Sequence, residues 1–561
     1  MSSAFGLGCC IRRTVALILF SRTLGSGFLE HGESNLTAED IQNDIQKAMG
    51  AALGCGGEMG AAQLNTIEKD LRKMWLTLPK NENGRIERRM FRYLAHRYFM
   101  RTSSLMVRGF EPTRVVNRSH WGAADILSQR VPGYVESVLE SADAKEKGFT
   151  LEDAVTLVAT LQQLIFDAES TLLELLYLEH SIPVESLITF EKLAGVLEDY
   201  TVHWMMGGDE EGAAMLLADR NLIDNTFPHW SEIVHFLKGQ ISAFEFTGRW
   251  RRRHSNMLSR MYSFSDAHHI VNSITKTFAS FWESECVEMK NQLIDIDVSR
   301  TGRVPISKFY AASLSAEWRF GESEQYLREL GALDETSAWL GRQVIISNYM
   351  QAVSNCVVST PHYLVCCSNL CENILGDIEA AIGASEATHF EILSVVESLT
   401  APISIDDDSE PKLVGALTSQ LASIASNGKV KLHGRLFAQW LHYVFPNECP
   451  FPHKAGAVST ATPGEYGHEF IATDEEKKHH ASASNSSKLP TTESAEWMSQ
   501  WNPDEELMVD TVGNAFFTRT HQGLLFCAAF LLLVIVLVSV TRRFEQGRGA
   551  PHRNPDDRTE F

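Results

Sequence analysis

The sequence predicts an all-α protein: a multi-helix globular region with repeated helix–loop–helix units, followed by one C-terminal transmembrane helix. Three observations support this fold class. Apolar residues recur at helical spacing along most of the chain. Alternation typical of strands is rare, and QVIISNYM at 343–350 is the only short candidate. Near the C-terminus, Gly523–Val540 is an uncharged run of about eighteen residues, close to the minimum length for a membrane-spanning helix.

The N-terminal segment, residues 1–27, has the features of a secretory signal peptide. Two arginines, Arg12 and Arg13, precede the short apolar run Val15–Phe20, and small residues follow around Gly25–Gly27. A charged region, an apolar region and a small-residue exit are typical of export signals. An organelle transit peptide and an uncleaved anchor are the alternatives.

Three helical regions are expected next, at 28–135, 136–274 and 275–452. In the second region, Thr150 and Asp153 form an acidic variant of the capping box at the start of a long apolar stripe. In the third, the apolar spacing predicts a helix over Thr275–Ile294. The first contains LNTIEKDLRKMWLTL, whose apolar residues share one helical face: Leu64, Ile67, Leu71, Met74, Trp75 and Leu78.

Three loops between predicted helices share a glycine, a basic residue and a β-branched residue. The clearest is Asp297–Lys308. With Gly302 at the sixth position of a calcium loop, Asp297, Ser299 and Thr301 fill the first, third and fifth, and Arg303 offers its carbonyl oxygen at the seventh. This arrangement resembles an EF-hand. The other two loops carry Asn81, Asn83, Gly84 and Ile86, and Ser423, Asn427, Gly428 and Val430.

All three loops lack the glutamate that normally supplies two oxygens at the twelfth position. The residues there are Met90, Lys308 and Gly434. We therefore expect either plain helix–turn–helix connections or degenerate EF-hands kept for helix pairing. Calcium is the one cofactor to consider, and its binding at Asp297, Ser299, Thr301 and Arg303 should be no tighter than about 10⁻⁴ M.

The cysteines between the two ends are seven in number, and an exported chain allows disulfides among them. The odd number leaves at least one without an intramolecular partner. We expect Cys371 and one neighbour to bond to Cys356 or Cys449. A metal site at His362 is disfavoured, because adjacent cysteines point about 100° apart on a helix. The disulfide candidates are Cys356, Cys366, Cys367, Cys371 and Cys449.

The chain changes character after Pro452. Residues 453–510 are rich in Ser, Thr, Ala and Gly, which predicts a flexible stalk before the transmembrane helix at 522–541 and the tail at 542–561. Trp497 and Trp501 either pack on the globular region or lie at the membrane interface. Arg542 and Arg543 follow the span directly, so the positive-inside tendency places the tail in the cytoplasm.

A signal peptide and a stop-transfer helix together predict a type I single-pass protein. Its helical part would lie outside the cytosol, in the endomembrane system or at the cell surface. Three glycosylation candidates, Asn35, Asn117 and Asn485, give weak support. If the signal prediction is wrong, a tail-anchored, calcium-responsive protein that faces the cytosol is the alternative.

The formal charge of −21, from 50 basic and 71 acidic residues, excludes a broad nucleic-acid surface. No glycine-rich phosphate loop, nucleophile elbow, paired-carboxylate motif or HExxH motif occurs, so no catalytic residue is assigned. We expect an interaction or scaffold module for an unidentified protein partner, with at most weak calcium modulation. The alternative is a hydrolase or redox enzyme whose site is assembled from His96, Cys366, Cys367 and His433.

These two functions predict different structures. A deep pocket that holds two or more of the four side chains would favour the enzyme. A solid core with a conspicuous apolar surface patch would favour the interaction module.

Three stretches of the chain resemble a known family: GFTLEDAVTLVATLQQLIFDAEST, WRFGESEQYLRELGALDE and LHGRLFAQWLHYVFPNECPFPH. They are similar to a large family of uncharacterised membrane-anchored proteins of unicellular algae, chiefly dinoflagellates. The resemblance spans about Leu64 to His453. It implies an EF-hand-like helical architecture with no established activity, and it carries over no catalytic residue.

Overall fold

The computed structural model describes residues 61–114, 124–130, 147–227, 229–251, 261–314, 319–336, 340–400, 415–482, 498 and 500–505. The predicted signal peptide, membrane span and tail lie outside these residues, as do Asn35, Asn117 and Asn485. Within the described part of the chain, no helix combines the length and apolarity that crossing a bilayer requires.

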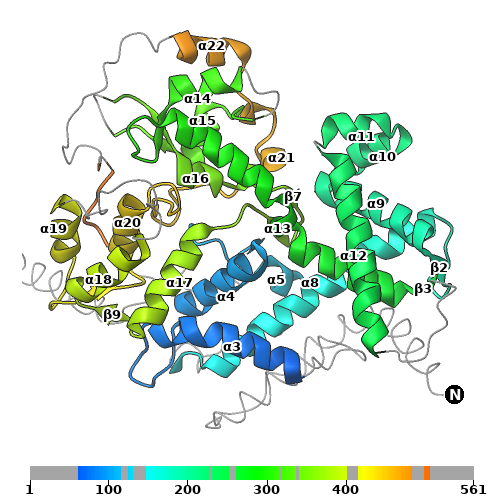
Figure 1. Cartoon of the computed structure of the whole chain (residues 1–561), viewed down its shortest axis with the longest axis horizontal. Coiled ribbons are helices and arrows are strands. Elements are labelled where there is room, and N and C mark those ends of the chain that lie inside the picture. The colour runs from blue at the N-terminus through cyan, green and yellow to red at the C-terminus, as the bar shows by residue number, and fades with distance from the viewer. Residues whose placement is uncertain are drawn as a thin grey trace, which may run out of the picture. The chain divides into compact units, whose positions relative to one another are not determined.

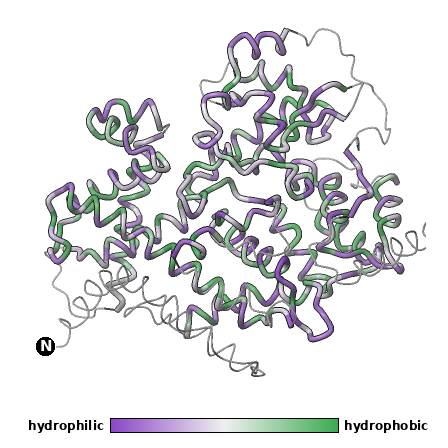
Figure 2. Tube along the Cα trace, turned by 180° about the vertical axis from the view of Figure 1, so that it is seen from behind, coloured by the Kyte–Doolittle hydropathy of each residue, from purple (hydrophilic) through white to green (hydrophobic). Residues whose placement is uncertain are grey.

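The described residues are mostly helical, which confirms the predicted all-α class (Figure 1). The longest helices are α8 and α13, and Figure 2 shows hydrophobic and hydrophilic residues alternating along the helices. The helices of the first half are α3 (Ala61–Thr77), α4 (Arg88–Ser103), α5 (Asp125–Arg130), α8 (Leu151–Glu179), α9 (Phe190–Met206), α10 (Glu210–Ala218), α11 (Asn221–Thr226), α12 (Trp230–Arg251) and α13 (Phe264–Ile296).

The second half has shorter helices. They are α14 (Ile306–Ser313), α15 (Glu324–Glu329), α16 (Ile346–Met350), η3 (Val353–Asn355), α17 (Leu370–Ile382), α18 (His389–Thr400), α19 (Gly415–Ser423), α20 (Arg435–Val444), α21 (Pro463–Tyr466), η5 (His468–Phe470) and α22 (Asp474–Ser482). The strands are equally short: β1 (Leu105–Val107), β2 (Ile188–Thr189), β3 (Met261–Tyr262), β4 (Arg303–Pro305), β5 (Leu333–Asp334), β6 (Gln343–Ile345), β7 (Val358–Ser359), β8 (Tyr363–Val365), β9 (Glu386–Ala387) and β10 (Val430–Lys431).

Short antiparallel pairings join the loops that precede the helices, two loops at a time. In the described residues there are four such loop pairs, and each pairs one central residue with another. The paired residues are Ile86 with Phe149, Ile188 with Tyr262, Val304 with Val344, and Ala387 with Val430. Each pairing satisfies backbone groups that the loops would otherwise leave open.

The position of each helix relative to the paired residue is regular. The helix that follows begins two residues later, for example at Ile306 after Val304 and at Ile346 after Val344. Helix α20 is the exception, because three residues intervene between β10 and Arg435. The long helices α8 and α13 are each shared by two successive helix–loop–helix units. A paired residue lies just before each of these helices, and a further loop follows it. The chain is therefore built from linked pairs of helix–loop–helix units.

Two further features connect parts that are far apart in sequence. Strands β1, β8 and β7 form a three-stranded antiparallel sheet in which Leu105 lies opposite Val365. One hydrophobic cluster contains α13, α14, α15, α16 and β8 residues, with Phe309 and Tyr326 fully buried. A second cluster is centred on Trp440 of α20. Together these contacts place α4, α17 and α20 next to the segment that follows Phe451.

The segment predicted to be a flexible stalk from residue 453 has structure in its described part. Helix α22 packs on α14, and Ile471 pairs with Glu322 in an antiparallel bridge (Figure 1). The amide of Gly456 donates to the carbonyl oxygen of Thr113 at 2.8 Å. Trp501 packs against the cluster around Trp440. Besides the backbone hydrogen bonds, Tyr466, Phe470 and Ala472 pack against the hydrophobic cluster around Phe309.

Two local assignments also differ from the sequence-based prediction. The cysteine-rich stretch around Cys366 and Cys367 follows strand β8 and is not helical; α17 begins only at Leu370. The predicted region boundary at 274/275 lies inside α13, which starts at Phe264 rather than at Thr275. The reason is the capping box of Ser263 and Asp266, which starts the helix earlier than the apolar spacing alone indicated.

Candidate functional site: a basic cavity beside helix α4

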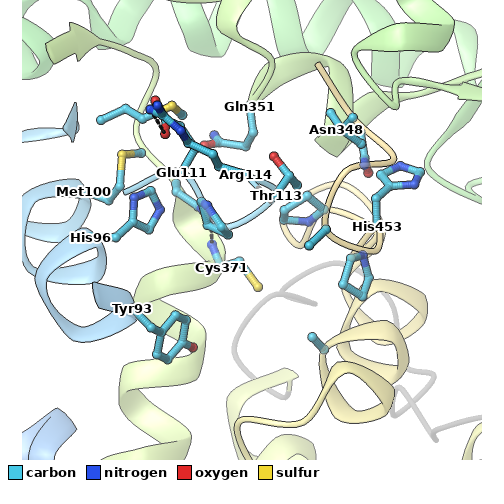
Figure 3. A pocket seen from close by; sticks show the side chains of 18 of the residues that line it. Tyr93, His96, Met100, Glu111, Thr113, Arg114, Asn348, Gln351, Cys371 and His453 are labelled. Carbon is cyan, nitrogen blue, oxygen red and sulfur yellow. Dashed lines mark hydrogen bonds and ion pairs between the residues drawn. The ribbon is translucent and has the colours of Figure 1, made fainter. Parts of the chain in front are cut away.

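A cavity of about 390 Å³ lies between α4, α17, α20 and the segment 450–460. Its volume is in the range typical of sites for small organic molecules. Figure 3 shows His96 and His453 on opposite sides of it, with Gln351 and Asn348 along a third side. Apolar side chains such as Met106 and Leu375 form much of the remaining wall.

One face of α4 supplies the polar wall. Residues three and four apart lie on the same side of a helix, so Arg89, Arg92, Tyr93, His96 and Met100 all line the cavity. This helix is buried along most of its length although its mean hydropathy is low. The sequence signal was present in RRMFRYLAHRYFMR, where basic residues share the spacing of the apolar ones. Of the residues on this face, only His96 was predicted from the sequence as a candidate site residue.

Arg92 is 8% exposed and has few partners for its guanidinium group. Its Nη2 donates to the carbonyl oxygen of Gly109 at 2.7 Å, and the group lies over the Phe110 ring. Its Nε is buried without a hydrogen-bond partner among the described residues. Burial lowers the pKa of Arg92 to about 10, partly offset by the negative charge of Glu111. A buried donor left unpaired costs about 1–3 kcal/mol.

His96 is 7% exposed, and its Nδ1 is also buried without a hydrogen-bond partner in the described residues. Burial lowers the pKa of His96 to about 4, against the charge of Glu372, which raises it. The imidazole is therefore neutral at physiological pH. A neutral imidazole donates from one ring nitrogen and accepts at the other.

A buried ion cluster lies beneath the cavity. The Nε of Arg97 is 2.5 Å from a Glu372 oxygen, and its Nη1 is 2.5 Å from a Glu379 oxygen. His433 completes the cluster: its Nε2 is 3.2 Å from the hydroxyl of Thr77 and 3.4 Å from Glu379. Burial lowers the pKa of His433 to about 3. The cluster connects α4, α17 and the segment before α20, and in it the single cation Arg97 is shared by Glu372 and Glu379.

The cavity is positively charged in an acidic protein. Its lining has four arginines and two glutamates, so its formal charge is 4 − 2 = +2, whereas the chain carries −21. Glu372 is paired with Arg97, and Glu111 accepts from the amide of Gly109 and lies 3.7 Å from Arg114. The formal charge of the lining favours an anion over a cation.

The residues of the predicted alternative enzyme site are only partly brought together. His96 and His433 both line the cavity. Cys366 and Cys367 lie instead in the cluster around Phe309 and do not line it. Both cysteines are in disulfides, so neither is a free thiol nucleophile.

The predicted calcium loop has its carboxylate closed off by backbone amides. Asp297 is 6% exposed, and its Oδ2 accepts from the amide of Gly302 at 2.7 Å. Burial raises the pKa of Asp297, and hydrogen bonds from the amides of Ser299, Thr301, Gly302 and Arg303 oppose that shift. Ser299 is exposed. No cluster of three or more metal-ligating side chains occurs in the described part of the chain.

Arg303 of this loop makes an ion pair with the neighbouring loop. Its Nε donates to Asp334 Oδ2 at 2.9 Å, and both side chains are almost fully buried, at 2% and 1% exposed. The guanidinium group lies over the ring of Tyr443, and Nη1 donates to the carbonyl oxygen of Thr301 at 3.2 Å. The positively charged guanidinium group of Arg303 therefore lies between the two loops of this pair.

The other two predicted loops are closed by local hydrogen bonds. In the first, the side-chain oxygen of Asn81 accepts from the amides of Asn83 and Arg85, both at 3.0 Å. In the last, Ser426 and Lys429 pair across the turn at Asn427 and Gly428. The turn of the first loop contains one carboxylate, the exposed Glu82, and the last loop, residues 423–434, contains none.

Six cysteines form three pairs at disulfide distance. Cys286 pairs with Cys367, Cys356 with Cys366, and Cys371 with Cys449. The pair of Cys371 with Cys449 is one of the two that the sequence analysis considered. Cys286 was not among the candidates there, because it lies in the middle of the long helix α13, 81 residues before its partner.

No protein-family model matches the chain, and neither a curated protein nor a solved structure matches it. The resemblance to membrane-anchored algal proteins therefore stays a prediction. Roles for individual residues rest on the geometry described above.

Proposed function

We propose that the chain is a membrane-displayed binding scaffold, built from four pairs of EF-hand-like units that hold their shape without calcium. Two features support the EF-hand-like assignment. The loops are joined in pairs through one central residue each, such as Val304 with Val344. In addition, Gly302 at the sixth position has the positive φ of +71° that a tight loop requires.

The distribution of carboxylates among the loops carries the proposal. If each paired residue is counted as the eighth loop position, the first position is acidic only at Asp297. The twelfth position is acidic only at Asp153, Asp266 and Glu391. No loop therefore has an acidic residue at both ends, and Ca²⁺ needs six to eight oxygens that include a bidentate carboxylate at the twelfth position.

The three acidic twelfth residues have another use. Asp153 and Asp266 accept hydrogen bonds from the backbone and side chain of Thr150 and Ser263, which forms a capping box at each helix start. Glu391 does the same with Thr388, at 2.8 Å for both contacts. These carboxylates stabilise helix N-termini, as capping boxes do in general.

Where a carboxylate remains in or near a loop, other groups of the protein satisfy its charge in place of a metal ion. Arg303 neutralises Asp334, and backbone amides satisfy Asp297. At the twelfth position of the Asp297 loop stands Lys308, a cation where calcium binding requires an anion. Calcium is consequently proposed as a weak ligand at most, at Asp297, Ser299, Thr301 and Arg303.

The proposed location follows the predicted topology. The globular region would lie outside the cytosol in the endomembrane system or at the cell surface, anchored by the span at 522–541 and bound to a protein partner. Disulfides form and persist in oxidising compartments, so the three cysteine pairs support this location.

An enzyme is the second candidate, favoured by the two histidines that line one cavity. The cavity does not present an activated nucleophile among the described residues: Cys371 is in a disulfide with Cys449. Its two glutamates are paired with arginines. The apolar-patch criterion gives no clear support to the scaffold either, because Leu178, Val298 and Phe390, each at least 70% exposed, lie on different elements.

Calorimetric titration of the full-length chain with Ca²⁺ tests the calcium-independent scaffold. We expect no binding tighter than about 10⁻⁴ M. Lys308→Glu should create a measurable site, because it places a carboxylate at the twelfth position of the one loop that begins with an aspartate. Lys73→Glu makes the same charge change on the exposed face of α3 and should create none.

Two results would contradict the proposal. Micromolar calcium binding that is lost in Asp297→Ala would show that the loop is a functional calcium site. A Lys308→Glu variant that still ignores calcium would argue against the EF-hand-like assignment itself.

A further inference from the structure

The cavity beside α4 has a composition that points to one class of ligand. Its lining combines Arg92 and His96 with apolar side chains, among them Met106, Leu375 and Phe110, whose ring lies beneath the Arg92 guanidinium. Nothing in the scaffold function requires such a cavity, and a tightly packed interior would be the ordinary result of folding.

The polar groups of the lining match a carboxylate. In the described residues Arg92 makes one hydrogen bond, from Nη2, and its side chain lines the cavity. The imidazole of His96 lines the cavity as well, with its Nδ1 enclosed by protein atoms. Arg92 and His96 are four residues apart on one helix face, so their side chains are neighbours. Two adjacent donors, one of them charged, suit the two oxygens of a single carboxylate group.

We propose that this cavity binds a small monocarboxylate with an apolar body, whose carboxylate group contacts Arg92 and His96 and whose apolar part lies along Met106, Phe110 and Leu375. The formal positive charge of the lining favours an anion. The apolar wall excludes a purely polar ion as the best ligand. This inference does not depend on the scaffold proposal.

Titration of the full-length chain with 4-phenylbutanoate, followed by calorimetry, tests the site. We expect saturable binding with one ligand per chain. The uncharged analogue 4-phenylbutanol has the same apolar body and should bind at least tenfold more weakly, because it lacks the anionic group.

Two variants locate the binding. Arg92→Gln should weaken 4-phenylbutanoate binding at least tenfold and leave 4-phenylbutanol binding nearly unchanged. Arg101→Gln removes the same charge from an exposed position on the same helix, outside the cavity lining, and should leave both affinities unchanged. Leu375→Trp fills the apolar part without changing any charge, and it should abolish binding of both compounds; its circular dichroism spectrum shows whether the fold is kept.

Three outcomes would overturn the proposal. The first is the absence of 4-phenylbutanoate binding below millimolar concentration. The second is equal affinity for the acid and the alcohol. The third is unchanged 4-phenylbutanoate binding in a folded Leu375→Trp variant, which would show that the compound binds elsewhere. This last test remains valid even if Arg92→Gln fails to fold.

Discussion

At the scale of single residues, Gly302 and Gly84 occupy corresponding sixth positions in two loops and differ in what surrounds them. Both have a φ of +71°. A Cβ on Gly302 would meet Pro446 atoms, the backbone oxygen among them, at 2.6 Å, whereas a Cβ on Gly84 would meet nothing within 4 Å. The first glycine therefore serves both a backbone conformation and a close contact, and the second serves the conformation alone.

We predict that Gly302→Ala and Gly84→Ala destabilise the protein unequally. Gly84→Ala should lower the free energy of unfolding by about 1 kcal/mol, the usual cost of a left-handed conformation for a residue with a Cβ. Gly302→Ala should cost about 1–3 kcal/mol more, because the loop and Pro446 must move apart. Urea unfolding followed by circular dichroism measures both. Equal losses would mean that the loop moves away from Pro446 without cost.

Glu169 is a second residue whose surroundings decide its behaviour. It lies on α8 and is 4% exposed. Tyr363 donates to its Oε1 at 3.3 Å, and Trp204 in turn donates to the Tyr363 hydroxyl at 3.0 Å. Burial raises its pKa to about 7, against hydrogen bonds from Thr275, Asn272 and Tyr363, which lower it. Burial therefore keeps the Glu169 carboxyl group neutral in the folded protein below about pH 7.

The raised pKa of Glu169 predicts a pH-dependent stability. Between pH 4.5, the pKa of an unperturbed glutamate, and about 7, the folded state keeps a proton that the unfolded state has lost. The stabilisation is thus fully present below about pH 4.5 and is lost as the pH rises through 7. Glu169→Gln, always neutral, should be more stable than the wild type at pH 8, by a free energy of unfolding on the order of 3 kcal/mol, with little difference at pH 4.5.

Unfolding by urea at several pH values measures this difference. Glu174→Gln, at an exposed position on the same helix, is the control and should follow the wild type at every pH. Buried histidines such as His433 change the free energy of unfolding with pH in the same way in all three proteins, so their contribution cancels in the comparison. A Glu169→Gln variant that stays parallel to the wild type from pH 4.5 to 8 would show that this carboxyl group titrates normally.

At the scale of elements, the pair of loops at Val304 and Val344 is held by an internal ion pair as well as by its backbone. Arg303 and Asp334 come from different loops and are both buried. Burying two charges costs desolvation energy, so the pair adds little net stability, but the loss of one partner leaves the other charge buried and alone.

We therefore predict that Arg303→Met lowers the free energy of unfolding by about 3–5 kcal/mol. Arg328→Met in the same unit is the matched control. Arg328 is 43% exposed and pairs with Glu324 and Glu335, so its loss should cost less than about 1 kcal/mol. Adding Asp334→Asn to Arg303→Met should restore part of the stability, because it removes the uncompensated charge. Chemical unfolding of the four proteins measures all of this, and an equal loss in the two single variants would contradict the assigned role.

The elements themselves were predictable wherever the signal is local. The buried face of α3 and the capping box at Thr150 and Asp153 were both identified from the sequence and are confirmed. Loop pairing was not predicted: only three of the eight paired loops were noticed, since Phe149, for example, joins a loop 63 residues away through two backbone hydrogen bonds. Long-range pairing leaves no periodic pattern in either partner.

The candidate site was less predictable than the fold. His96 and His433 were named among residues of a possible assembled site, but Arg92 was not, because a basic residue on a helix is most often at the surface. The cavity arises only when α4, α17 and α20 come together. Likewise, the segment 453–482 was predicted to be flexible because its few apolar contacts, such as those of Tyr466 and Phe470, are widely spaced and leave no periodic pattern in its composition.

At the scale of the whole molecule, the three disulfides agree with the type I topology that we propose from the sequence of the terminal segments. Three cysteine pairs fall within residues 286–449, and such bonds persist outside the cytosol. Two of them close long loops, with separations of 81 and 78 residues, and a disulfide typically contributes about 2–4 kcal/mol to stability. The apolar run Gly523–Val540 and the arginines after it predict one span with a short cytoplasmic tail.

We predict that protease added to sealed microsomes removes only the tail, residues 542–561, and leaves the globular region intact. The reason is that the arginines after the span favour the cytoplasmic side, which puts the globular region in the lumen. Detection with one antibody against the tail and one against α8 distinguishes the two sides, and microsomes opened with detergent are the control in which both signals must disappear. The same sealed sample, alkylated without reduction, should contain a cross-linked peptide pair with Cys371 and Cys449. Digestion of the globular region in sealed microsomes, together with free thiols at these two cysteines, would replace the type I topology with a tail-anchored protein that faces the cytosol.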